Sequence, residues 1–321
     1  MRTTLHVVPG DEVPFFFQAY VERRSPAERR GIESLLVQAG LCGQEEAGDL
    51  LQALHRRVLD VLAEKGPSTV RTIGQAVPEL KAQVRHNVGK SYAGQFSVGS
   101  RLVPGMCALG LLIRARPRGT WRSNLHTYAA LSDWLPDVDL EAVTPQKAQA
   151  WLARHYLSAF GPATPGDVQW WTGFSGRETK EALQPLRPAL VEGDLEGAGE
   201  GYLMLADDAR RLDAFDPPGS GYAFFLPGLD PYIMGRRFLS PEHRDKVFDR
   251  AGNAVPTVWS GGRVVGVWKQ RRDGSVVYGL FEPVSEKARA RLEERREQLE
   301  AFLEGESLSQ RTHTRFIRAL K

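Results

Sequence analysis

The sequence has only two cysteines, Cys42 and Cys107, and no Cys or His stands near either of them at metal-ligand spacing. A disulfide framework and a zinc site are therefore not expected, and we interpret both thiols as reduced and inert. Also missing are an apolar run of about 18 residues and, at the N-terminus, the basic-then-apolar pattern of a signal peptide. We expect a cytoplasmic protein with no membrane partner.

Signatures of several enzyme classes are absent as well. The sequence contains no Walker loop, no Rossmann fingerprint after a strand, no H-E-x-x-H, no C-x-x-C and no G-x-S-x-G. We therefore expect no cofactor and no metal. The net charge of +3 is too small to indicate a nucleic-acid partner by itself. The positions of the basic residues carry more information.

The 321 residues contain a short motif twice, as Gly66-Pro67-Ser68-Thr69 and as Gly161-Pro162-Ala163-Thr164. Each copy follows a stretch in which apolar residues recur at helical spacing. Gly ends a helix and the following Pro forbids its continuation. In the second copy Thr164 is expected to cap the next helix, which Gly173 closes. Ser175 and Glu178 then form a capping box for a third helix.

The first copy adds two strands after its helices. A helical stretch ends at Leu109-Gly110, an apolar run follows at residues 111–113, and residues 124–131 form the second strand. The order helix, helix, helix, hairpin predicts a winged helix, so the repeat predicts two of them.

The last third of the chain has a different pattern. Pro256 to Trp259, Arg263 to Trp268 and Val276 to Phe281 alternate as short strands around Gly-Gly and Asp-Gly turns, which predicts a small antiparallel sheet. A helix with a stripe at Ala288, Leu292, Leu299, Phe302 and Leu303 is expected to pack across it.

The ends of the chain complete an α+β organisation. Thr3 to Val8 is interpreted as a strand without a partner, two helices are expected within residues 11–40, and a mobile basic tail is expected after Gly305. The expected parts are an N-terminal remnant at 1–45, winged-helix domains at 46–135 and 143–212, a β-rich domain with its helix at 213–305, and the tail at 306–321.

Basic residues gather in three places. Arginine suits phosphate because its rigid fork of donors matches the phosphate oxygens. At the tip of the predicted hairpin this chemistry favours DNA binding, and a solvated basic turn is the alternative. On the helix that Ser175 and Glu178 are expected to cap, a plain surface-charge role is equally open. The DNA-binding candidates are Arg114, Arg116, Arg118, Trp121 and Arg122 of the hairpin, Arg177 and Lys180 of the helix, and Arg236 and Arg237 near the next motif.

Other side chains allow two interpretations each. Trp170 and Trp171 could stack on an unpaired base or anchor helices to one another. Asp230, in Leu226-Pro227-Gly228-Leu229-Asp230-Pro231-Tyr232, could be a turn residue or a carboxylate in a site. His6 and His126, each in a Leu-His step on a predicted strand, are either hydrogen-bonded structural residues or part of a site.

The motifs that carry a resemblance to a known family are Gly161 to Pro165 with Trp170-Trp171-Thr172-Gly173, the Gly119 to Arg122 segment, the Leu226 to Tyr232 loop and the Pro256 to Gly266 hairpin. The sequence resembles the winged-helix DNA glycosylase family over about residues 1 to 304. The resemblance implies tandem winged helices, a monomer bound to double-stranded DNA, and excision of alkylated or crosslinked bases by hydrolysis of the N-glycosidic bond. It also implies that His6, Asp230 and Tyr232 face the lesion.

The family's catalytic signature, Gln, a hydrophobic residue, then Gln or Asp, is not found in this sequence. In the family it lies upstream of a strand that residues 1–6 resemble, so we expect the catalytic segment to be missing, and no catalytic residue is assigned. Two alternatives stay open: a transcription regulator built from the same winged helices, expected as a dimer on palindromic sites, and a truncated product that neither folds fully nor functions.

Overall fold

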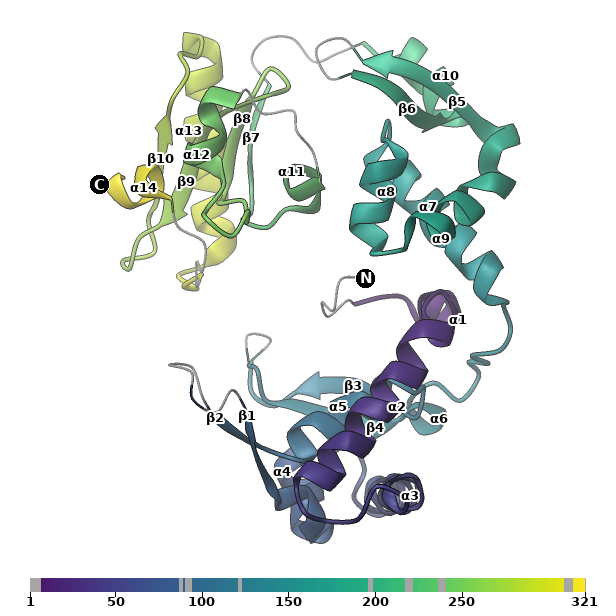
Figure 1. Cartoon of the computed structure of the whole chain (residues 1–321). Coiled ribbons are helices and arrows are strands. Elements are labelled where there is room, and N and C mark those ends of the chain that lie inside the picture. Colours follow the sequence, from purple (N-terminus) through teal and green to yellow (C-terminus); the bar gives the residue numbers. More distant parts are fainter. Residues whose placement is uncertain are drawn as a thin grey trace. The chain divides into compact units, whose positions relative to one another are not determined.

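The computed structural model describes residues 7–86, 89, 94–120, 123–195, 199–216, 222–235, 241–308 and 314–320. The described chain forms two units: one extends to Leu152 and the other begins at Ala153. Both combine helices with small antiparallel sheets, which confirms the α+β class (Figure 1). Among the described residues, no helix is long and apolar enough to cross a membrane.

The N-terminal unit is mainly helical. A short 3-10 helix (Gly10–Glu12) precedes two helices within the range expected from the sequence. The elements in chain order are α1 (Val13–Gln18), α2 (Val21–Gln38), α3 (Ala47–Lys65), α4 (Val70–Ala76), β1 (Gln83–His86), β2 (Gly94–Ser97), α5 (Gly99–Ala108), β3 (Leu112–Pro117), β4 (His126–Ala130) and α6 (Leu131–Trp134), after which α7 (Pro145–Phe160) continues into the second unit.

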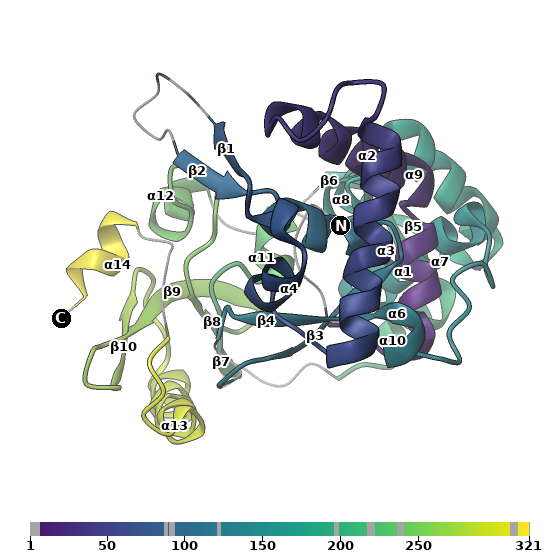
Figure 2. The same ribbon diagram turned by 90° about the horizontal axis from the view of Figure 1, so that it is seen from below.

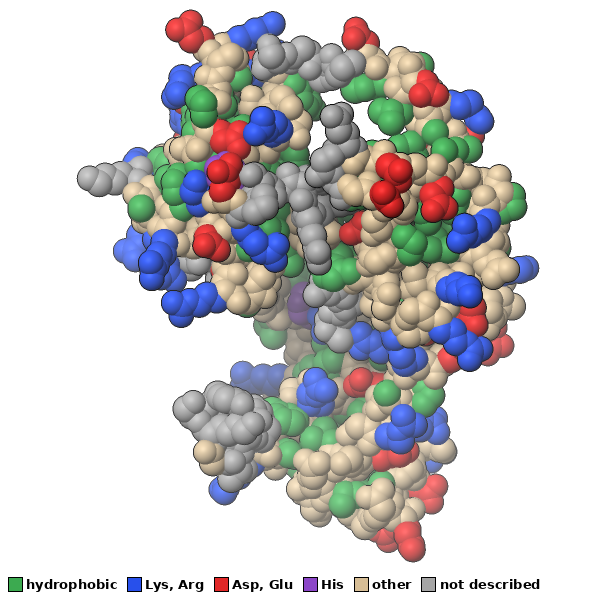
Figure 3. Space-filling view, turned by 45° about the horizontal axis from the view of Figure 1, so that its top comes forward, with side chains coloured by type: hydrophobic (Ala, Val, Ile, Leu, Met, Phe, Trp, Pro, Cys, Tyr) green, Lys and Arg blue, Asp and Glu red, His purple; other side chains and the backbone are tan. Residues whose placement is uncertain are grey.

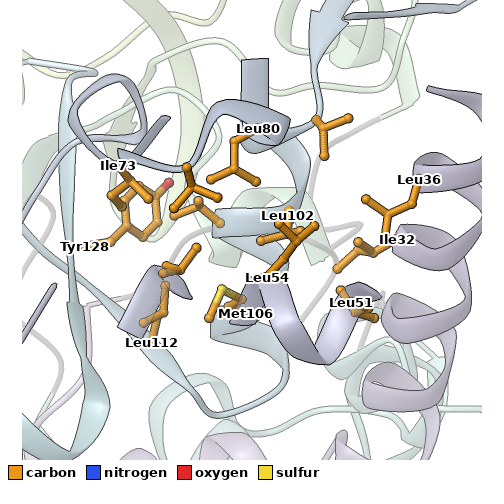
Figure 4. Packing of buried hydrophobic residues seen from close by; sticks show 14 of the residues in the cluster. Ile32, Leu36, Leu51, Leu54, Ile73, Leu80, Leu102, Met106, Leu112 and Tyr128 are labelled. Atoms are coloured by element: carbon orange, nitrogen blue, oxygen red, sulfur yellow. The ribbon is translucent and has the colours of Figure 1, made fainter. Parts of the chain in front are cut away.

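Helices α2, α3 and α5 enclose the core of this unit. Leu51, Leu54 and Val58 recur three or four residues apart on α3, so they share one face of the helix and are buried. Leu102 and Met106 of α5 meet them in the same cluster (Figure 4). β4 contacts α3, so the β3–β4 hairpin is attached to the core (Figure 2).

The repeated motif performs the same task in both units. Gly66, at φ 68°, ends α3. Ser68 then exchanges two backbone hydrogen bonds with Tyr128 of β4, with N to O distances of 2.9 and 2.8 Å. Ala163 does the same with Leu203, also at 2.9 and 2.8 Å. In each copy the turn that ends the preceding helix is therefore joined to the second strand of a later hairpin.

The elements around the second copy repeat the order of the first. The C-terminal unit has α8 (Pro165–Thr172), α9 (Gly176–Leu183), β5 (Leu190–Leu195), β6 (Gly199–Leu205) and α10 (Ala206–Asp213). Thr164 with Asp167 and Ser175 with Glu178 form reciprocal capping boxes, and Gly173 closes α8 at φ 71°. These caps confirm the sequence predictions. The first copy differs by the β1–β2 hairpin between its second and third helices, which the sequence pattern did not reveal.

The rest of the C-terminal unit is a four-stranded antiparallel sheet in the order β10-β9-β8-β7. Its strands are β7 (Ala223–Leu226), β8 (Thr257–Ser260), β9 (Arg263–Gln270) and β10 (Val276–Leu280), and its helices are α11 (Pro231–Gly235), α12 (Arg244–Val247), α13 (Glu286–Leu303) and α14 (Arg315–Ala319). Three strands and α13 confirm the sequence prediction, whereas β7 was not expected.

The sheet has two buried faces, and a β-bulge at Val265 shifts the alternation of side chains along β9 by one residue. Val265 and Trp268 of β9 belong to the cluster with Leu292 of α13. Val264 and Val267 point the other way and pack with Ile317 of α14. Figure 2 shows α13 nearly end-on along one face of the sheet.

Three expectations need correction. Phe302 is 82% exposed: at about 100° per residue it lies at the edge of the stripe, about 40° beyond Ala288 and away from Leu292 and Leu303. The basic tail is not mobile over 314–320: the Thr314 hydroxyl donates to the carbonyl of Lys246 at 2.9 Å, and Ile317 is 1% exposed. The expected strand at Thr3 to Val8 lies largely outside the described residues, and its described end, Val7 and Val8, is not a strand.

Candidate nucleic-acid interface

The β3–β4 hairpin carries three exposed arginines, Arg114, Arg116 and Arg118. Ala115 between them is buried, so the strand places apolar atoms inside and guanidinium groups outside. Within the part of the chain that the structure describes, neither Arg116 nor Arg118 forms an ion pair, so both guanidinium groups are available to an external anion. On the face shown in Figure 3, Lys and Arg side chains are interspersed with Asp and Glu, so local clusters of this kind matter more than net charge.

A bulge shapes the hairpin at these residues. Arg114 stands opposite Tyr128 and Pro117 stands opposite His126, so β3 has one residue more than β4 over this stretch. The Thr127 hydroxyl donates to the carbonyl of Arg116 at 2.7 Å, and the amide of Arg118 donates to Leu125 at 2.8 Å. The backbone that carries the arginines is therefore held on both sides of the bulge.

Arg114 differs from the other two because it has an aromatic partner. Its guanidinium carbon lies 6.0 Å from the ring centroid of Tyr128. Burial raises the pKa of the Tyr128 phenol, and the positive charge of Arg114 partly opposes that rise. The phenol thus stays protonated at neutral pH, and Arg114 is positioned over a neutral ring.

The hairpin prediction was wrong about where its tip begins. β3 continues through Pro117, so Arg114 and Arg116 lie on the strand and only Arg118 follows it. The extension is possible because the bulge keeps the pairing with β4 across Ala115 and Arg116. Trp121 and Arg122, expected beside them, lie outside the described residues.

The two basic residues of α9 have different surroundings. Arg177 is paired with Glu181 one turn later at 2.8 Å, so its charge is already opposed. Lys180 is exposed, forms no ion pair among the described residues, and lines a cleft of about 640 Å³ together with Arg187, Gln169, Gln184 and the apolar Leu183. Of the pair chosen from the sequence, Lys180 is the better candidate for binding an anion.

The Leu226 to Tyr232 motif forms the loop between β7 and α11. The Asp230 carboxylate accepts a hydrogen bond from the amide of Tyr232 at 2.9 Å, which gives it the turn role and caps α11. The Tyr232 ring lies 5.9 Å from that of Trp259. Contact of either residue with a lesion stays a prediction. Arg236 and Arg237, like His6, lie outside the described residues.

The same loop contains a backbone outlier. Leu229 has φ 62°, in the left-handed region, which costs a leucine about 1 kcal/mol or more. Its side chain is 50% exposed. The sequence motif gave no sign of this conformation.

Trp171 has the structural role that was one of its two interpretations. Its ring lies 5.2 Å from Tyr156 and 6.4 Å from Phe160, both on α7, so it anchors α8 to the preceding helix. Trp170 lies against Gly235, where an added Cβ would come within 3.0 Å of the indole. These contacts leave the tandem tryptophans less suited to stacking on a base.

A charged cluster that the sequence did not reveal lies beside the sheet. His243 is buried, and its Nε2 is 2.7 Å from Glu282 Oε1 while Lys246 Nζ is 3.2 Å from its Nδ1. Because an ammonium can only donate, Nδ1 accepts and Nε2 carries the proton that goes to Glu282. Arg263 lies 3.1 Å from the other carboxylate oxygen. With Glu242, these His and Glu atoms lie close enough to hold a metal, but two cations already neutralise the cluster.

The partly buried thiol of Cys107 has no reactive character. Burial raises its pKa to about 12, so it stays protonated. The two groups beside Arg114 whose pKa values are shifted, Tyr128 and Cys107, are both raised by burial and stay protonated at neutral pH, so neither supplies a base or a nucleophile there. The described geometry therefore supports binding of an anionic polymer more directly than it supports a reaction.

Comparison with known proteins connects this geometry to a family. A family model described as DNA glycosylase AlkZ-like matches residues 1–302. An interstrand DNA cross-link repair glycosylase of Streptomyces sahachiroi is 33% identical over 148 residues, which are 43% of this chain and 37% of that protein. The match thus spans well under half the length of that curated relative.

A solved structure is similar over most of the chain. The DNA glycosylase AlkZ of Streptomyces sahachiroi has a TM-score of 0.64 and 22% identity, covering 92% of this chain and 78% of that chain. At this identity the likeness concerns the fold. The alternative of a transcription regulator gains no support from these comparisons.

Proposed function

The chain belongs to the AlkZ-like DNA glycosylase family, and on that premise we propose that it binds double-stranded DNA through two winged-helix modules in the repair of alkylated or crosslinked bases. The observation that carries the proposal is the β3–β4 hairpin, with Arg116 and Arg118 exposed and outside any ion pair of the described residues. Phosphate oxygens are the ligands that such guanidinium groups bind best.

The element order supports the winged-helix part of the proposal. α3, α4, α5 and the β3–β4 hairpin form the first module, and α7, α8, α9 and the β5–β6 hairpin form the second. In both, the turn after the first helix pairs with the second strand of the hairpin. We propose domain limits near 46–135 and 143–212, with the β-rich part at 213–305.

The substrate and partner are proposed from the relatives. The curated relative is named for repair of interstrand DNA crosslinks, and a damaged duplex is the corresponding ligand here. We assign no side chain a catalytic role. A monomer is proposed because one chain already supplies two modules, where a helix-turn-helix dimer uses two subunits.

The decisive experiment measures duplex binding across a salt series. Each neutralised phosphate contributes about 0.9 to the slope of log affinity against log salt. Replacement of both Arg116 and Arg118 by Ala is therefore expected to lower the slope by about 1.8 and to weaken binding. Arg291→Ala is the matched control, because that exposed arginine is already paired with Glu294 on α13.

An unchanged slope in the double variant would remove the hairpin from the interface. Wild-type protein that binds no duplex at low salt would contradict the proposed function as a whole. A second readout is release of the base from a duplex with an N7-alkylguanine. Release assigns glycosylase chemistry to this chain, while salt-sensitive binding without release restricts it to DNA binding.

A further inference from the structure

The loop between β7 and α11, whose course is visible in Figure 1, presents an apolar tip. Pro227, Leu229 and Pro231 alternate along it and are all exposed, with Leu229 at 50%. A single exposed leucine is ordinary in a globular protein. What distinguishes Leu229 is that the surrounding structure holds it in an unfavourable conformation.

The left-handed backbone of Leu229, at φ 62°, is retained by contacts on either side. Its amide donates to the carbonyl of Ala254 at 3.0 Å. Gly228 lies so close to Pro256 that an added Cβ would be 3.3 Å from the proline Cδ. The tip therefore rests on the segment from Ala254 to Pro256 and cannot relax by moving toward it.

Both ends of the loop are fixed as well. The Trp268 indole donates to the carbonyl of Leu226 at 2.8 Å, which holds the end of β7. Asp230 caps α11, and Ile233 in that helix is 6% exposed. The backbone that carries the apolar side chain of Leu229 is thus fixed before binding, so little conformational entropy is lost when this side chain enters a binding partner.

We propose that Leu229 is a wedge that inserts between stacked bases of the bound duplex and unstacks them. The inference rests on the proposed DNA binding. Side chains such as leucine are used as wedges because the base stack is the apolar interior of a duplex, and their insertion bends or opens it. Backbone strain kept at an exposed position points to a function that needs that side chain there.

The test uses short duplexes that contain 2-aminopurine, whose fluorescence rises when it is unstacked. The full chain is compared with Leu229→Gly, Leu229→Met and Leu212→Ala, the last removing a leucine that is 56% exposed on α10. Leu229→Gly is expected to abolish the rise and weaken binding about tenfold, while its melting temperature stays at or above that of the wild type because Gly accepts φ 62°. Leu229→Met and Leu212→Ala are expected to keep the rise.

The wedge alone would be overturned by wild-type protein that binds duplex without any rise, or by Leu229→Gly that binds and unstacks like the wild type. A rise lost equally in Leu212→Ala would also contradict it, because the effect would not depend on the loop. Failure of the wild-type protein to bind duplex at low salt would overturn the proposed function, and the wedge with it.

Discussion

The buried histidine of α3 should make the N-terminal unit sensitive to acid. His55 is 8% exposed, and its Nε2 has no hydrogen-bond partner among the described residues. Burial, with a smaller contribution from the charge of Arg29, lowers its pKa from 6.5 to about 4. The folded protein therefore resists protonation of this ring, whereas the unfolded chain takes up the proton near pH 6.5.

The direction and the size of the stability change with pH follow from proton linkage. A group with a lowered pKa in the folded state contributes stability above its unfolded pKa and loses that contribution as pH falls toward its folded pKa. The full difference corresponds to about 3 kcal/mol, at about 1.4 kcal/mol per pKa unit. Between about pH 7.5 and pH 5 the expected loss is about 2 kcal/mol.

The assay is urea denaturation of the wild type and His55→Leu at the two pH values. The two proteins share every other ionisable group, so the difference between the two pH dependences isolates His55. We expect the wild type to lose about 2 kcal/mol more than the variant. Equal losses in both proteins would refute the reasoning, because His55 would then titrate alike in the folded and unfolded states.

Two further changes test the C-terminal unit. Thr164→Ala removes the hydroxyl that accepts a hydrogen bond from the amide of Asp167 in the capping box of α8. The free energy of unfolding should fall by about 1 kcal/mol, which thermal denaturation would detect. An unchanged melting temperature would show that the cap does not stabilise the protein. Ile317→Ala leaves a cavity under α14 and should cost about 2 to 4 kcal/mol, measured by urea denaturation, whereas a loss below about 0.5 kcal/mol would mean that α14 does not stabilise the sheet.

The features that the sequence predicted are those determined within a few residues. The capping boxes at Thr164 and Ser175 and the glycine after α8 depend on neighbours at most three or four positions away, so the residue types alone indicate them. Strands β8, β9 and β10 were found because alternation and Gly-rich turns mark them. The same local patterns located the arginines of the β3–β4 hairpin.

The features that were missed depend on contacts between distant residues. β7 is a strand because it pairs with β8 across the loop that holds α11 and α12, and its own four residues show no alternation. His243 and Glu282 are 39 positions apart, so no spacing could indicate their hydrogen bond.

The two modules differ in what separates their second and third helices. In the second module only residues 173–175 stand there, whereas the first contains a short 3-10 helix and the β1–β2 hairpin. Both nevertheless keep the capping threonine and the paired bridge to the last strand. The architecture thus leaves this connection free to vary in length, since closing a longer surface loop adds little entropy cost. In the second module, however, a longer connection would have to keep the closing Gly173, the buried Phe174 and the capping Ser175 in place.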